Sequence, residues 1–242
     1  MQLVDNAIEI PELRDYVGVF ADRADAGRIL AQMLAAHRDT NALVVAIPAG
    51  GVPVGMAMAG VLNLSFDVAP VSKITLPWNS ESGYGAVAFD GTVRLNEHLL
   101  SSIGLSDEEV ALGQKQTLQK VQRRMRIFRG DVPFPKLDER PIIVVDDGLA
   151  SGFTMRVALE ALRKLGAKNL IVAVPTAHVA AISDISRDAS QVYCANVRSG
   201  RRFAVASAYR AWRDVSDEEV VQALDAANER SQEAAGHKDP HA

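Results

Sequence analysis

A short apolar segment that ends in two adjacent carboxylates constrains this chain most. Ile142 to Val145 are four apolar, β-branched residues, which predicts a buried strand of a parallel sheet. Asp146 and Asp147 follow directly, and a loop rich in small residues extends to Thr154. Beyond it, apolar residues recur at helical spacing until Gly166, which is suited to end a helix. The sequence therefore predicts a strand, an acidic pair, a loop and a helix, in that order.

The parts of this segment suit a phosphorylated sugar. Small loop residues let backbone N–H groups approach an anion closely, and the start of a helix adds a partial positive charge. Ser151 and Thr154 add hydroxyl donors. The carboxylates of Asp146 and Asp147 accept hydrogen bonds, which suits the vicinal hydroxyls of a sugar. We therefore expect a ribose 5-phosphate group to bind here.

Two other interpretations of the segment are an ordinary strand-to-helix turn and the acidic pocket of a response-regulator receiver. A receiver has its acidic pair near the start of the domain and a phosphorylated Asp one strand later. Here the pair lies beyond residue 140, and the next expected strand, Leu170 to Pro175, contains no Asp. We therefore favour the sugar-phosphate interpretation, because the motif lies in the strand–loop–helix context that it requires.

Length and composition indicate a globular α/β protein. The 242 residues are 48% hydrophobic, which is enough for one domain with a sizeable core. The net charge of −4 gives no general reason to expect nucleic acid or an anionic membrane as a partner. Cys194 is the single cysteine, which fits a reducing cytoplasm. We expect neither a signal peptide nor a membrane-spanning segment.

Strands and helices alternate along the rest of the chain. The apolar patterns predict strands over 42–48, 66–72, 142–145, 170–175 and 191–197, and helices over 20–36, 52–62, 106–129 and from 216 onward. Such alternation predicts a parallel sheet that helices cover on both faces. The loops after Pro48, Lys73 and Val145 would then meet at the carboxyl edge of this sheet, where ligands bind.

We expect a single domain over residues 1–228. Segment 74–96 has no periodicity and contains several glycines, which predicts a flexible functional loop. Residues 1–20 and 198–215 are expected to form cap elements. The polar tail over 229–242 is expected to be disordered.

Val144 to Thr154 closely resembles the phosphoribosyl pyrophosphate (PRPP) motif of type I phosphoribosyltransferases. Further segments, such as Asp22 to Arg28, Gly85 to Ala88 and Ser216 to Val220, occur in the same order in a group of bacterial and archaeal phosphoribosyltransferase-domain proteins. The resemblance covers most of residues 20–225. It implies a Rossmann-like fold, with a parallel sheet flanked by helices and a small hood.

The resemblance also implies roles for the motif. Asp146 and Asp147 would hold the ribose hydroxyls. The 5-phosphate would be held by the loop residues Gly148, Leu149, Ala150, Ser151, Gly152, Phe153 and Thr154. The implied cofactor is Mg²⁺, which would bind mainly through pyrophosphate and ribose oxygens, with the two carboxylates close by.

A second anion site is implied after Pro48. Ala49, Gly50 and Gly51 resemble the pyrophosphate loop of the family, although Ala49 stands where members often carry Lys or Arg. Members commonly have a cis non-proline peptide in this loop, and we expect it at or beside Ala49.

Two cationic residues are implied to contact the pyrophosphate. Lys73 ends an expected strand at the ligand edge and is counted with the acidic pair as a catalytic residue. Arg94 lies at the far end of the 74–96 hood loop and would reach the pyrophosphate when the hood closes. Closure would exclude water from an oxocarbenium-like state.

Three further groups have a structural and a functional interpretation. Trp78 and Tyr84 either stack on an acceptor ring or anchor the hood loop. Six basic residues over 115–129 form either a solvated helix face, which we favour, or an RNA-binding surface. The aromatic and basic residues over 201–213 either stack on an acceptor base or pack as a cap on the sheet edge.

The implied reaction is Mg²⁺-dependent transfer of the phosphoribosyl group from PRPP to a nucleobase-like nitrogen acceptor, with release of pyrophosphate, in nucleotide salvage by a homodimer. Ala150 stands where 6-oxopurine enzymes carry an Asp that serves the purine, which argues against such an acceptor. Two alternatives stay open: a non-catalytic PRPP or nucleotide sensor that regulates transcription or RNA, and hydrolysis or salvage of another phosphorylated ribose compound. We do not expect a membrane or nucleic-acid partner for the transferase.

Overall fold

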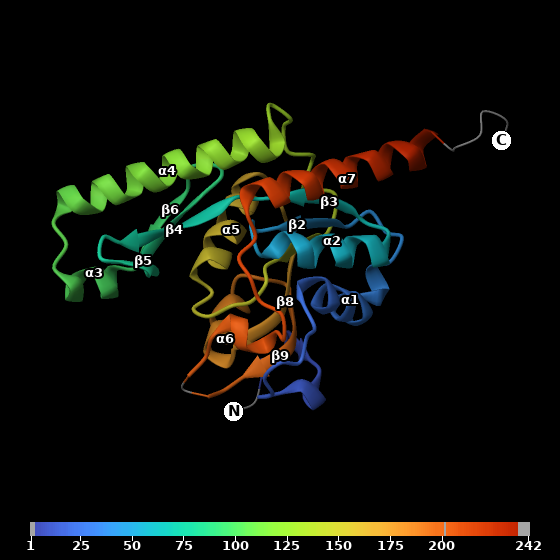
Figure 1. Ribbon diagram of the computed structural model, residues 1–242, viewed down its shortest axis with the longest axis horizontal. Helices are drawn as coiled ribbons and strands as arrows, with labels where there is room; N and C mark the ends of the chain where they lie inside the picture. Colours follow the sequence, from blue (N-terminus) through green and yellow to red (C-terminus); the bar gives the residue numbers. More distant parts are fainter. Residues whose placement is uncertain (1–2, 201, 237–242) are drawn as a thin grey trace.

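Six parallel strands form the central sheet (Figure 1). The computed structural model describes residues 3–200 and 202–236. The strands lie in the order β1 (Ala7–Glu9), β9 (Gln191–Arg198), β8 (Leu170–His178), β7 (Ile142–Val145), β2 (Leu43–Ala46) and β3 (Ser65–Val68). Every neighbouring pair is parallel, which confirms the predicted α/β class. The N-terminal segment, expected only as a cap, contributes the edge strand β1.

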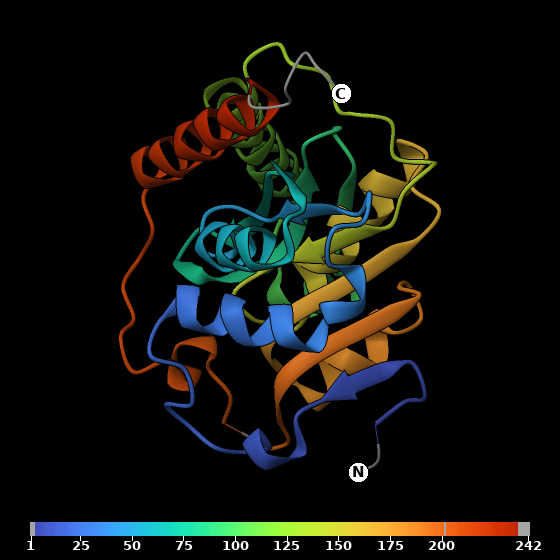
Figure 2. The ribbon, with the colours of Figure 1, turned by 90° about the vertical axis from the view of Figure 1, so that its right-hand side faces the viewer.

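Helices cover both faces of the sheet, because the buried strands present apolar side chains to both sides. These helices are α1 (Arg23–Met33), α2 (Gly51–Leu62), α5 (Phe153–Lys164) and α6 (Val179–Ile185). Ile143 and Val145 of β7 share an apolar cluster with α1 and α2, which stand in front of the strands in Figure 2. Ile142 and Val144 pack on the opposite face with α5 and α6. Because successive side chains of a strand point to opposite faces, β7 packs against both layers of helices.

The strand expected over 66–72 is wrong as a single element. The chain forms β3, leaves the sheet at Ala69 and Pro70, and resumes as β4 (Val71–Leu76) in a second sheet. Proline has no backbone N–H and cannot continue a ladder inside a sheet, so Pro70 separates the two strands. Lys73 consequently lies within β4 and not at the end of a strand of the central sheet.

The expectation of an irregular loop over 74–96 is also wrong. This segment belongs to an antiparallel sheet in the order β4, β5 (Asn79–Ala88) and β6 (Val93–Leu95). The short helix α3 (Glu97–Ile103) and the long helix α4 (Asp107–Arg129) complete this unit, which extends to one side of the central sheet in Figure 1. We call residues 71–129 the hood.

Small residues explain why the hood sheet has no visible pattern in the sequence. A Cβ atom at Gly85 would lie 2.7 Å from the backbone oxygen of Arg94 and 2.9 Å from a side-chain carbon of Ile74. The close approach of β5 to its neighbours therefore requires glycine. Ala86 and Ala88 are fully buried in the same strand. These residues carry little apolar signal, so the alternation expected of a strand is absent.

A capping box starts α4 as the sequence predicts. The Ser106 hydroxyl accepts from the backbone N–H of Glu109 at 3.2 Å, and the Glu109 carboxylate accepts from the backbone N–H of Ser106 at 2.8 Å. The helix then runs to Arg129 and packs along the hood sheet, so its start fixes one end of the hood.

Replacing Ser106 by Ala is expected to lower the free energy of unfolding by about 1 kcal/mol, because one helix N–H loses its acceptor. The exposed Lys115→Ala variant on the same helix should change it by less than about 0.5 kcal/mol. Urea unfolding of both variants measures the difference. An equal effect of both substitutions would show that the cap does not stabilise α4.

The chain ends in α7 (Asp217–Gly236), which runs beside the end of α4 (Figure 1). The backbone N–H of Glu219 donates to the Ser216 hydroxyl at 3.2 Å, so the second predicted helix start is confirmed. Residues 229–236 are helical, where composition predicts disorder, and residues 237–242 lie outside the described residues. Among the described helices, none has the length and apolar character needed to cross a membrane.

Candidate functional site

The acidic pair lies at the carboxyl end of β7, and the loop after the neighbouring strand β2 packs directly against it. A Cβ atom at Gly50 would lie 2.0 Å from Oδ2 of Asp147, so only glycine fits there. The peptide bond between Pro48 and Ala49 is cis, as expected for this loop. The two segments singled out from the sequence, 48–51 and 146–154, therefore meet at one edge of the sheet.

The loop after the acidic pair is fixed by its own backbone. The N–H of Leu149 donates to Thr176 at 2.9 Å, and the N–H of His178 donates to Leu149 at 3.0 Å. Leu149 itself is buried. This bridge to the end of β8 holds the loop without using its other N–H groups.

The other N–H groups of this loop are mostly unpaired. Within the described residues, the N–H groups of Ala150, Ser151, Gly152 and Thr154 have no hydrogen-bond acceptor, whereas that of Phe153 donates to the Ser151 hydroxyl at 3.4 Å. They lie where α5 begins, at the positive end of its dipole. Unpaired donors at a helix start form a site suited to a phosphate.

Burial makes the acidic pair unusual. It raises the pKa of the Asp146 carboxyl well above its ordinary value, and the negative charge of Asp147 adds to the effect. The pKa of Asp147 is also raised by burial, although the neighbouring Arg23 opposes this. Lys73 lowers the pKa of both carboxyls, so this exposed hood side chain acts on the pair electrostatically. The pair offers acceptors in surroundings where hydrogen bonds to a ligand are strong.

Arg23 is part of this site, and the sequence analysis missed it. Its Nε donates to Oδ2 of Asp147 at 2.9 Å, and only 8% of the residue is exposed. Arg23 is the first residue of α1, directly after the N-cap Asp22. A cation at the positive end of a helix dipole is unfavourable, and this placement is the signal that could have drawn attention to it.

Arg94 is not brought to the acidic pair. Its side chain forms an ion pair with Glu160 of α5, which also binds Lys164 at 3.1 Å. The predicted contact with pyrophosphate would require Arg94 to leave Glu160. The structure thus gives Arg94 a role in joining the hood to α5.

The remaining candidates divide into anchored and exposed side chains. Tyr84 is 1% exposed between the hood sheet and α4, so it anchors the hood and does not present a ring to an acceptor. Trp78 is 63% exposed at the far end of the hood. Of the basic residues on α4, Arg124 pairs with Asp217 at 2.8 Å and Arg129 pairs with Asp67. These pairs tie α4 to α7 and β3, which supports the structural interpretation of the helix.

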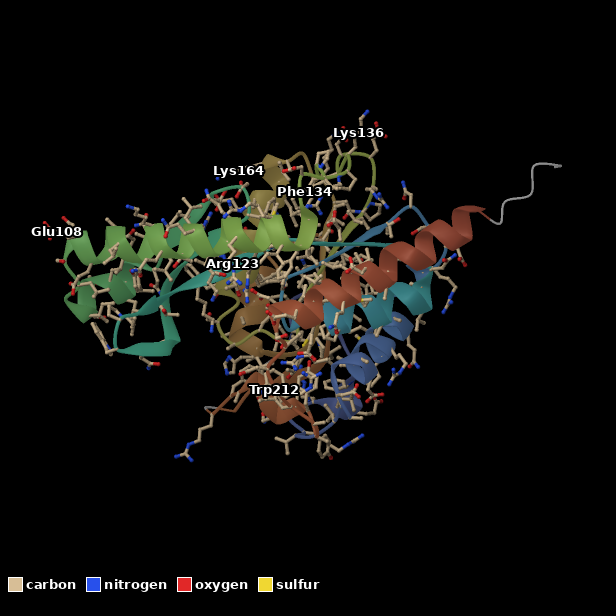
Figure 3. All side chains as sticks on the ribbon, turned by 45° about the horizontal axis from the view of Figure 1, so that its top comes forward. Glu108, Arg123, Phe134, Lys136, Lys164 and Trp212 are labelled. Carbon is tan, nitrogen blue, oxygen red and sulfur yellow. The ribbon has the colours of Figure 1, made fainter. Side chains whose placement is uncertain are left out.

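The segment before α7 packs over the acidic pair. The Tyr209 hydroxyl donates to the backbone oxygen of Asp147 at 2.6 Å, and Tyr209 contacts Trp212 with 5.2 Å between ring centroids. Trp212, labelled in Figure 3, has the guanidinium of Arg23 3.8 Å from its ring centre. These contacts support the interpretation of the segment as a cap on the sheet edge, and stacking on an acceptor base stays a prediction. Arg201, which the same prediction included, lies outside the described residues.

The fold and the site together define an α/β protein whose acidic pair and two adjoining loops lie at the carboxyl edge of a parallel sheet, where folds of this class bind ligands. The family model described as the phosphoribosyl transferase domain matches residues 95–207. Rv0571c of Mycobacterium tuberculosis strain H37Rv, whose name places it provisionally among the phosphoribosyl transferases, is 34% identical over 216 residues. The match covers 89% of this chain and 48% of that protein. The chain therefore spans about half the length of the curated relatives it matches.

A solved structure is similar to this chain over nearly its whole length. The protein TT1426 from Thermus thermophilus is 30% identical and has a TM-score of 0.67. The alignment covers 85% of this chain and 97% of that one. This chain belongs to the phosphoribosyl transferase family.

Proposed function

We propose that this protein transfers the 5-phosphoribosyl group from PRPP to a nitrogen acceptor and releases pyrophosphate. The observation that carries the proposal is the close approach of Gly50 to the Asp147 carboxylate, which brings the two candidate anion-binding loops together at one edge of the sheet. PRPP carries a phosphate and a pyrophosphate on opposite ends of one ribose. A ligand of that shape suits two loops with an acceptor pair between them.

The 5-phosphate end of PRPP would lie at the start of α5. Within the described residues, four N–H groups near this helix start have no acceptor, and the Ser151 and Thr154 hydroxyls can add donors. Asp146 and Asp147 would accept from the ribose hydroxyls. Since burial disfavours charge on both carboxyls, hydroxyl donors of the ligand stabilise them more than they would in water.

The pyrophosphate would lie on the β2 side of the ribose. Within the described residues the N–H groups of Ala49 and Gly50 have no acceptor, whereas that of Gly51 donates to the backbone oxygen of Ile47 at 3.1 Å. The first two would be the backbone donors of the loop 48–51, and the Lys73 cation acts on the acidic pair from the hood. Ala49 supplies no charge, so Lys73 would balance the negative charge of the leaving group. The acceptor would then approach from the β8 side, opposite the pyrophosphate, for an in-line displacement.

The chain's residues fit a magnesium ion that the substrate helps to bind. Among the described residues, no group of three or more His, Cys, Asp or Glu side chains lies together, but Asp146 and Asp147 form an adjacent carboxylate pair. Mg²⁺ is commonly bound through one or two carboxylates and substrate phosphates. When bound, the ion would neutralise charge on the departing pyrophosphate. Asp146 and Asp147 would hold the ribose beside it.

The acceptor would be a nitrogen base. A 6-oxopurine that is bound through a carboxylate at position 150 is disfavoured, because this chain has no carboxylate there. Ala150 is exposed and has no group to exchange a proton.

Incubation with PRPP, Mg²⁺ and single nucleobases, followed by measurement of pyrophosphate, tests the proposal. Release that depends on one base is expected. PRPP binding without release by any nitrogen base would favour the alternative of a sensor, for which the missing cation at Ala49 is the supporting observation.

We further propose that the protein is a cytoplasmic homodimer that acts in nucleotide salvage. The single cysteine, Cys194, is buried, which suits a reducing compartment. Sedimentation measurements of the free and PRPP-bound protein test the dimer.

Removing the Lys73 cation is expected to raise the KM for PRPP about 10- to 100-fold, the equivalent of one charge-assisted contact. The variant is Lys73→Met, which keeps the length of the side chain. Lys168→Met, an exposed lysine remote in sequence from both loops, is the matched control. Steady-state kinetics of pyrophosphate release compare the two, and equal KM values would remove Lys73 from the site.

A further inference from the structure

One buried cation touches the proposed ribose site and contributes no group to either anion loop. Arg23 contacts Oδ2 of Asp147 through Nε and through its terminal Nη2, both at 2.9 Å. Its other terminal nitrogen, Nη1, donates to the backbone oxygen of Arg213 at 2.7 Å. Both contacts with the carboxylate involve Oδ2, and within the described residues no side chain donates to Oδ1 of Asp147.

The guanidinium is held in place from a second direction. It lies 3.8 Å from the ring centre of Trp212 and 5.9 Å from that of Tyr209. Tyr209 in turn donates to the backbone oxygen of Asp147 at 2.6 Å. Asp147 is therefore fixed at its backbone by Tyr209 and at its side chain by Arg23.

The arrangement suits arginine and no other residue. A planar guanidinium can contact a carboxylate, a carbonyl oxygen and an aromatic face at once, whereas an ammonium is a single compact charge. The position at the start of α1 works against the helix dipole, so helix stability does not explain a cation there. The exposed Arg28 on the same helix, 3.4 Å from Asp25, makes none of these contacts.

We propose that Arg23 is a positioning residue, which holds Oδ2 of Asp147 so that Oδ1 faces one ribose hydroxyl of the sugar phosphate. The aromatic segment Tyr209 to Arg213 keeps Arg23 in that position. This inference rests on the proposed function, because the ligand is the same PRPP. It assigns to α1 and to the segment before α7 a part in substrate binding that neither anion loop supplies.

Calorimetric titration of PRPP with Mg²⁺ into the Arg23→Gln, Arg23→Lys and Arg28→Gln variants tests the proposal. Arg23→Gln should weaken PRPP binding about 10- to 100-fold, as for the loss of one charged hydrogen-bond partner. Arg23→Lys, which keeps the charge but not the planar geometry, should lie between Arg23→Gln and the wild type. Arg28→Gln should bind as the wild type does.

A rescue experiment separates positioning from a general loss of structure. In Arg23→Ala, added guanidinium chloride at tens of millimolar should restore PRPP affinity at least in part, and sodium chloride at equal concentration should not. A purely structural role predicts no recovery by guanidinium over sodium. Circular dichroism of each variant confirms that the titrated protein is folded.

The outcomes also distinguish this inference from the proposed function. If the wild type does not bind PRPP, the proposed function fails. If the wild type binds and Arg23→Gln binds equally well, only the positioning role fails. Tighter binding by Arg23→Gln would also overturn it, because Arg23 would then compete with the ribose for Asp147.

Discussion

The double variant Asp146→Asn, Asp147→Asn is expected to bind PRPP roughly 10²- to 10⁴-fold more weakly than the wild type. Each carboxylate would accept a hydrogen bond from a ribose hydroxyl, and a charged acceptor contributes roughly 1.5–3 kcal/mol. The amide retains the shape of the side chain but loses the charge. Isothermal titration with PRPP and Mg²⁺ measures the loss.

The thermal stability of the single variant Asp146→Asn shows whether this substitution unfolds the protein, which would also weaken PRPP binding. Burial raises the folded-state pKa of Asp146, so the charged carboxylate destabilises the free protein once the pH exceeds the ordinary carboxyl pKa. The amide removes this cost. Asp146→Asn should therefore raise Tm at pH 7, and the gain should shrink as the pH falls towards 4. A lower Tm at pH 7 would contradict this account of the buried pair.

Replacing Gly50 by Ala should affect both folding and binding. The new Cβ would lie 2.0 Å from Oδ2 and 2.6 Å from Cγ of Asp147, whose carboxylate Arg23 already holds. Overpacking of this kind costs about 1–3 kcal/mol. Because relief requires Asp147 or the 48–51 loop to shift, PRPP affinity should fall more than 10-fold, as for a displaced charged contact.

The same helix offers the matched control. Gly60 lies near the end of α2, and a Cβ atom there would meet no atom within 4 Å. Gly60→Ala should stabilise the protein by about 0.5–1 kcal/mol, because alanine favours the helix. PRPP affinity should not change. Thermal unfolding and titration of both variants compare a glycine that the site requires with one that it does not.

The element that carries the motif could be predicted from the sequence because its signals are local. Four consecutive β-branched residues, Ile142 to Val145, predict a buried strand, and the apolar spacing after Phe153 predicts the helix that follows. The carboxyl ends of parallel strands share one edge, so the meeting of loop 48–51 with Asp147 could also be predicted. The structure confirms each of these features.

The hood and Arg23 could not be predicted in the same way. The hood strands carry small residues such as Gly85 and Ala86, whose role is close approach, and they leave no alternating pattern. Pro70 follows the end of β3, and a proline at this position predicts that the strand expected over 66–72 is interrupted there. Arg23 and Asp147 are 124 positions apart, and no local rule joins residues at that separation.

Titration of PRPP with Mg²⁺ into the wild-type protein tests the central claim most directly. We expect saturable binding at one site per chain, with affinity that falls strongly in the Asp146→Asn, Asp147→Asn variant. Binding of equal strength in the two proteins would contradict the assignment of the ribose site. Absence of heat with folded wild-type protein would contradict PRPP recognition itself, and with it both the transferase and the sensor.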